Sequence, residues 1–270
     1  MTNGTLNHAS PPSRSPFPSP SSRPVPAGGA GLRGAVAFEW TKLVSLRSTW
    51  YLLLTAFAVL GLAAPGIGVT VHDPAASPAL PAAFAALYGT GLVVAGLAML
   101  SVTGEYATGG ITTSLQCVPG RARFLLAKCL VLGGLSFVAG LVLGAVGTVL
   151  GAVSMDASTF SGASVTGEVL AIGAYTALLS VLTLGLAVVL RSSAGTLTAL
   201  FLLLFVLPAV LGMVPGGVLD EAATLLPQGA GERLLGGGTG YGPGLGLPLL
   251  AAWALLSVGV GAQVLRRRDA

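Results

Sequence analysis

The residues with the clearest capacity for chemistry lie between positions 101 and 128. One carboxylate, Glu105, is followed by three cations, Arg121, Arg123 and Lys128, and the stretch also contains a Gly-Gly and a Pro-Gly pair. No other segment between two apolar runs combines charge, turn residues and helix formers in this way. These side chains can carry ionic contacts. We therefore predict a polar connection between two membrane helices that contacts a partner.

The residue types needed for catalysis by the chain itself are missing or poorly placed. No Gly-x-x-x-x-Gly-Lys-Ser/Thr loop and no His-Glu-x-x-His pair occurs. The only histidines are His8 and His72, and neither is placed to activate a serine. Cys117 and Cys129 have no nearby histidine and lie toward the predicted cytoplasmic face, a reducing compartment. We predict no catalytic, cofactor-binding or metal-binding residue, and no enzyme activity.

The composition indicates a membrane protein. Apolar residues make up 53% of the chain and charged residues 8%, whereas a water-soluble domain carries about 25% charged residues. Several apolar runs are long enough to cross a bilayer, and they are too long and too uniformly apolar for a transmembrane barrel. The expected fold is all-α and polytopic. The 40 glycines suit helices that approach one another closely.

Six transmembrane helices are predicted, at about residues 50–71, 84–102, 125–153, 169–190, 196–214 and 245–265. Two pairs of glycines four residues apart, Gly140 with Gly144 and Gly147 with Gly151, predict close packing of the third span. Pro208 should kink the fifth span or mark its weak point. Between the last two spans, Val218 to Leu226 and Ala230 to Leu235 are expected to form short helices.

Residues 31–49 predict an amphipathic helix on the membrane surface. Apolar side chains recur there at helical spacing: Leu32, Val36, Trp40 and Leu43. Glu39 and Lys42, three positions apart, are placed to pair on its polar side. Two interpretations stay open. The helix is an anchor before the first span, or it is an elbow that touches a cytoplasmic partner.

Residues 1–30 are rich in Pro, Ser and Gly and cannot bury an apolar face. We predict a disordered cytoplasmic tail there, without the apolar core of a secretory signal. Residues 31–270 then form one transmembrane domain.

The distribution of charge predicts the orientation. Only Arg233 of the 13 Lys and Arg residues falls on the second side of the six spans. Cytoplasmic loops carry the excess of Lys and Arg, so both termini and Cys117 should be cytoplasmic. The net charge of +4 has the same origin, and no nucleic-acid partner is expected. No charge lies near the centre of a span, which argues against an ion-coupled transporter.

Three segments carry a resemblance to a known family. Residues 39–48 read EWTKLVSLRS, residues 103–111 read TGEYATGGI and residues 226–231 read LPQGAG. With the order of surface helix, two spans, polar connection and four more spans, the chain resembles the permease subunit of type 2 ATP-binding-cassette (ABC) transporters, in the form common in actinobacteria. The segments look like the family's surface helix, first cytoplasmic loop and outer segment. The likeness covers roughly residues 33–268.

The resemblance implies a transport function in a bacterial plasma membrane. Two permease subunits, identical or paralogous, would bind two separate ATPase subunits, which hydrolyse ATP and drive export. The residues that the resemblance assigns to coupling with the ATPase are Glu39, Lys42, Gly104, Glu105, Tyr106, Gly109, Pro119, Arg121, Arg123 and Lys128. Apolar span surfaces favour a hydrophobic or amphipathic cargo.

The coupling roles and the transport function each have a simpler alternative. Glu105 would only cap the N-terminus of a short helix, and the cations after it would only follow the charge rule for cytoplasmic loops. The alternative function is a scaffold, a sensor or a passive carrier that has no ATPase partner.

Overall fold

The computed structural model describes residues 31–73, 76–110, 120–155, 162–213, 217–236 and 243–267. The expected tail at 1–30, together with Cys117 and Pro119, lies outside these ranges. Every regular element within them is a helix, and six helical segments are long and apolar enough to cross a membrane. The all-α class and the six candidate spans are thereby confirmed.

The second, third, fourth and sixth helical segments extend beyond the predicted spans at one end or both, because polar residues continue their turns, whereas the first ends at Gly68 and the fifth at Gly212, before the predicted residues 71 and 214. Helix α1 (Leu32–Ser45) precedes six spans: α2 (Arg47–Gly68); α3 (Leu80–Ala85), η1 (Ala86–Thr90) and α4 (Gly91–Ala107); α6 (Arg121–Ser154); α7 (Gly162–Leu190); α8 (Ser193–Phe201), η2 (Leu202–Val206) and α9 (Leu207–Gly212); and α12 (Gly246–Arg267). Between the last two lie α10 (Val218–Thr224), α11 (Pro227–Leu234) and η3 (Pro243–Leu245), so both expected short helices form.

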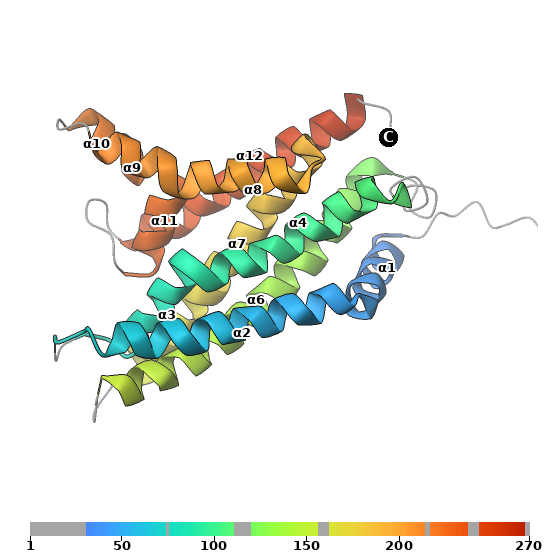
Figure 1. Cartoon of the computed structure of the whole chain (residues 1–270). Coiled ribbons are helices and arrows are strands. Elements are labelled where there is room, and N and C mark those ends of the chain that lie inside the picture. Colours follow the sequence, from blue (N-terminus) through green and yellow to red (C-terminus); the bar gives the residue numbers. More distant parts are fainter. Residues whose placement is uncertain are drawn as a thin grey trace, which may run out of the picture.

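Helix α7 is the centre of the bundle, with α4, α6 and α12 packed around it (Figure 1). Its buried side chains, among them Leu179, Leu182 and Leu184, join the other spans in two apolar clusters. A central helix buried on most faces has no amphipathic pattern, which is why the sequence of this span is apolar throughout.

The predicted glycine packing of the third span is confirmed. A Cβ at Gly140 would overlap Thr176 on α7, and one at Gly147 would lie 2.7 Å from the Cβ of Ala82 on α3. Gly151 meets the carbonyl oxygen of Pro78 in the same way. The first glycine pair thus faces α7 and the second faces the start of the second span. Small residues let these backbones approach closely.

The expected kink at Pro208 takes the form of a π-helical turn. Segment η2 ends two residues before Pro208, and the amide of Leu207 donates to the carbonyl of Leu202, five residues earlier. Proline has no amide hydrogen for the carbonyl four residues before it, and widening the helix redistributes the backbone bonds. A second π-helical turn, η1, lies in the second span.

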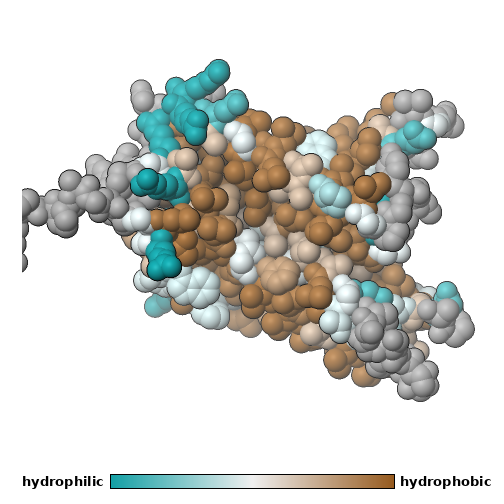
Figure 2. All heavy atoms as spheres, turned by 180° about the vertical axis from the view of Figure 1, so that it is seen from behind, coloured by the Kyte–Doolittle hydropathy of each residue, from teal (hydrophilic) through white to brown (hydrophobic). Residues whose placement is uncertain are grey.

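The two ends of the bundle differ in charge. Helix α1, the end of α4, the start of α6, the α7–α8 turn and the end of α12 lie together (Figure 1). These elements carry the described cations Arg33, Lys42, Arg47, Arg121, Arg123, Lys128, Arg191, Arg266 and Arg267. We call this the basic end. Arg233 lies on α11 at the opposite end, and Figure 2 shows a broad hydrophobic band between the two.

Candidate functional site

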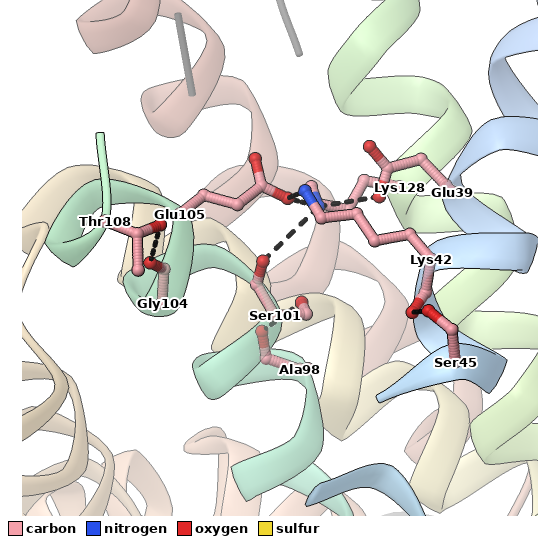
Figure 3. Close-up of polar contacts among 9 residues, drawn as sticks. All are labelled: Glu39, Lys42, Ser45, Ala98, Ser101, Gly104, Glu105, Thr108 and Lys128. Atoms are coloured by element: carbon pink, nitrogen blue, oxygen red, sulfur yellow. Dashed lines mark hydrogen bonds and ion pairs between the residues drawn. The ribbon is translucent and has the colours of Figure 1, made fainter. Parts of the chain in front are cut away.

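Four charged side chains from three helices meet inside the basic end (Figure 3). Lys128 Nζ on α6 lies 2.7 Å from Glu39 Oε2 on α1 and 2.6 Å from Glu105 Oε1 on α4. Lys42 Nζ on α1 lies 2.6 Å from the same oxygen of Glu105. We call these four residues the ion-pair network. It contains two carboxylates and two ammonium groups, so its formal charges balance.

The orientation of α1 differs from the one that the sequence predicted. Its buried residues are Ala35, Glu39 and Leu43, at helical spacing, whereas Leu32 is 39% and Trp40 48% exposed. The predicted apolar face was therefore partly wrong, because Glu39 occupies the face that packs on the bundle. A buried carboxylate is tolerated where a cation compensates it, and Lys128 does so.

The prediction that Glu39 lies with Lys42 on a polar face is also corrected, because Glu39 is buried. Only Lys42 of the two is partly exposed, and the ion pairs that the structure shows for them run to other helices. Each pair therefore links α1 to the bundle instead of reinforcing α1 alone.

Glu105 belongs to helix α4 and not to a connection outside it. It lies in the last turn and is 5% exposed. The short helix whose N-terminus Glu105 was expected to cap falls on residues outside the described ranges. In α4 itself Glu105 lies near the C-terminal end, whose partial negative charge disfavours a carboxylate. Two lysines offset that cost. Thr108 and Gly109 close the helix, with Gly109 at φ 69°, a conformation that glycine adopts without strain.

Lys128 is the centre of the network. It is 2% exposed, and its ammonium reaches the oxygens of Glu39 and Glu105 and, at 3.4 Å, the carbonyl oxygen of Ser101. An ammonium has three hydrogens, so these acceptors satisfy it. The ring of Phe124 lies 5.2 Å from Nζ and adds a cation–π contact. A lysine this deep in a core holds its position only with such partners.

The network leaves some oxygens without a hydrogen-bond partner. Glu39 Oε1 and Glu105 Oε2 are buried and have none among the described residues. Burial of ions without full compensation adds little net stability, and its better-attested role is to fix one relative placement of the elements. The network therefore sets the rotation of α1 on α4 and α6.

The other predicted coupling residues that the structure describes lie at the same end but outside the network. Arg121 donates to the carbonyl oxygens of Leu265 and Arg266 at 2.6 and 3.3 Å, so it caps the end of α12. Arg123 and Gly104 are exposed at the surface. The predicted residue Pro119 lies outside the described ranges.

Tyr106 and Arg191 form a contact that the sequence interpretation missed. The Arg191 guanidinium lies 5.0 Å from the Tyr106 ring and joins the α7–α8 turn to α4. Arg191 has φ 54°. Ser192 next to it is the N-cap of α8, and its side chain accepts a hydrogen bond from the amide of Gly195. The tight turn was predicted, but the partner of its arginine was not.

A signal for the buried network was present in the sequence. Lys128 lies within an apolar run, three or four residues from Leu125 and Leu132. That spacing places the lysine on a buried face, and Glu39 and Glu105 are the carboxylates expected on the same side. Reading Lys128 as a core residue would have led to both partners.

Within the described ranges, no three His, Cys, Asp or Glu side chains are placed to hold a metal ion. Comparison of the chain with models of known protein families gives no match, and no curated protein matches it either. The site therefore has to be interpreted from its own geometry.

Proposed function

We propose that this protein is the membrane-spanning permease subunit of an ABC transporter, powered by a separate ATPase subunit. The observation that carries the proposal is the ion-pair network. It joins α1, whose outer face is exposed at the basic end, directly to the spans α4 and α6. A partner that moves α1 would move these spans with it.

The network suits the transmission of force better than a set of apolar contacts. Charge-assisted hydrogen bonds are short and directional, and those of Lys128 are shielded from water. Apolar side chains can slide past one another, whereas Glu39 and Glu105 share one ammonium and so keep their register. The residues involved are those that the resemblance to type 2 permeases assigns to coupling, and the remaining cations lie around them.

The orientation completes the proposal. The basic end faces the cytoplasm, as the positive-inside rule requires, and both chain termini lie there. The membrane is the plasma membrane of a bacterial cell, the direction is export, and a second permease subunit completes the path. The ATPase subunits dock on the basic end, where Arg123 and the outer face of α1 are exposed.

The topology has a direct test in Cys117. We expect a membrane-impermeant maleimide to label Cys117 in opened cells and not in intact cells. A Cys117→Ser variant controls for reaction at Cys129, which lies within α6. Labelling of Cys117 in intact cells would overturn the orientation.

Co-purification tests the function. The tagged full chain, expressed with its genomic neighbours and extracted in mild detergent, should retain a nucleotide-binding subunit at about one copy per permease. Arg123→Glu should reduce the retained ATPase about tenfold, because it reverses an exposed charge at the proposed docking surface. Glu221→Lys, an exposed charge change on α10 at the opposite end, should leave it unchanged. Repeated recovery without any ATPase would favour a scaffold, a sensor or a passive carrier.

A further inference from the structure

A row of four aromatic rings links the second and fifth spans on the side away from the basic end. Phe84 stacks on Tyr88 with ring centroids 6.0 Å apart, and Tyr88 lies 6.2 Å from Phe205, which lies 5.2 Å from Phe201. Phe84 is 38% exposed, Tyr88 48% and Phe201 52%. We call these four residues the aromatic row. Phe201 lies near the middle of the fifth span, so the row extends from one end of the bundle into its apolar band.

Both π-helical turns of the described chain contribute to this row. Tyr88 belongs to η1 and Phe205 to η2, and their rings are in contact. A π-helical turn costs hydrogen-bond geometry and occurs frequently at functional sites. Pro208 accounts for η2, but η1 contains no proline. The widened turn of η1 places Tyr88 between the rings of Phe84 and Phe205.

A carboxylate lies beside the second ring of the row. Glu232 on α11 accepts a hydrogen bond from Tyr88 Oη at 2.9 Å and a long one, 3.5 Å, from Gln228 Nε2. Both donors are neutral, and within the described part of the chain Glu232 has no ion pair. Its neighbour Arg233 is buried and donates instead to the carbonyl oxygen of Thr224.

Glu232 and Tyr88 also line a cavity of about 140 Å³, together with Leu80, Ala83, Phe84, Leu87 and Leu235. Gln228, only 4% exposed, adjoins Glu232 and has a carbonyl oxygen without a partner. The space is thus bounded by apolar side chains, an aromatic face and a carboxylate whose two hydrogen-bond donors are neutral. It lacks a positive charge of its own.

We propose that Glu232 and the aromatic row form a binding site for an amphiphilic organic cation, with a substituted ammonium or phosphonium group attached to an apolar body. The carboxylate supplies the counter-charge, and the ring faces attract a cation through their quadrupoles. The small cavity takes one substituent of the cation. The exposed rings of the aromatic row contact the apolar body of the cation. A carboxylate repels an anion, and a neutral ligand gains nothing from Glu232.

If the chain is the proposed permease, the ligand of this site is its cargo, and this part of the inference rests on the proposed function. The physical binding claim does not need the ATPase. Tetraphenylphosphonium is a suitable probe, because its charge is buried among apolar rings. Tetraphenylborate has the same shape and the opposite charge, and so isolates the electrostatic contribution.

The experiment measures binding of labelled tetraphenylphosphonium to the full chain in nanodiscs, with the signal of empty nanodiscs subtracted. We expect saturable binding that Glu232→Gln weakens about tenfold, since the carboxylate charge is lost while its shape remains. Glu221→Gln, an exposed carboxylate on the adjacent α10, should have no effect. Tetraphenylborate should show no saturable binding. Absence of saturable binding, equal loss in both glutamate variants or equal binding of the borate would overturn the site.

The aromatic contribution has its own pair of variants. Tyr88→Leu should weaken binding about three- to tenfold, whereas Tyr88→Phe keeps the ring and should stay within about threefold of the unaltered protein. Equal affinities in the two variants would remove the ring from the site. Co-purification of the ATPase without phosphonium binding would refute the cation site alone. Binding without an ATPase would refute the transporter and leave the site in place.

Discussion

Replacing Lys128 by methionine should destabilise the protein by about 3–5 kcal/mol, the usual consequence of removing one partner from a buried ion pair. Methionine has nearly the length of lysine, so the change leaves little cavity. It leaves Glu39 facing Glu105 without the ammonium between them, in a region where both are about 5% exposed or less. Within the network Lys42 bonds to Glu105, so Glu105 keeps one ammonium partner. The loss of stability therefore comes mainly from Glu39, whose partner in the network is Lys128.

Thermal unfolding of the full chain in detergent measures this effect. A loss of that size corresponds to a fall in Tm of about 10 °C. Arg123→Met is the matched control, since Arg123 is an exposed cation on the same helix, five residues earlier, and should change stability by less than about 0.5 kcal/mol.

A triple replacement separates the unpaired charge from lost packing. Changing Glu39, Glu105 and Lys128 all to methionine removes every buried ion of the network, and the partly exposed Lys42 can then reach water. Exchange of buried ion pairs for apolar groups is often neutral or stabilising, so most of the lost stability should return. If the triple variant is as unstable as Lys128→Met, packing and not charge explains the loss. The restored variant should still stimulate its ATPase less, if the network transmits force.

Replacing Gly185 by leucine should separate α12 from α7 and cost about 3 kcal/mol or more. A Cβ on Gly185 would overlap the backbone carbonyl carbon of Ser257 and lie 2.7 Å from its oxygen. From the other side, a Cβ at Gly261 would lie 3.2 Å from the carbonyl oxygen of Gly185. Backbone atoms cannot rotate away as a side chain can, so the two helices have to move apart.

Gly134→Leu is the control for this change. Gly134 is exposed on α6, and a Cβ there meets nothing within 4 Å. Leucine favours the helix over glycine by roughly 0.5–1 kcal/mol, so this variant should keep or raise the Tm. Similar losses of Tm in the two variants would show that the cost does not come from the contact between α7 and α12.

Composition and local pattern determined much of the fold. Six apolar runs predicted six spans, because a bilayer admits only helices or closed barrels and these runs are too long for barrel strands. Gly140 and Gly147 predicted close helix contacts, since a residue without a side chain lets the backbone of any neighbouring helix approach closely. Pro208 predicted a break, because a missing amide hydrogen is a local property. Each of these features depends on residues near one another in the chain.

The sites were decided by the tertiary structure. Glu39 and Lys128 are 89 residues apart, and their pairing depends on which faces of α1 and α6 meet. The sequence placed Glu39 on a polar face because carboxylates are rarely buried, and the lysine that overrides this tendency comes from another helix. The same holds for Tyr88 and Glu232, 144 residues apart. Local periodicity reports whether a residue lies on an apolar or a polar stripe, whereas the partner of a buried charge is chosen by how the helices pack.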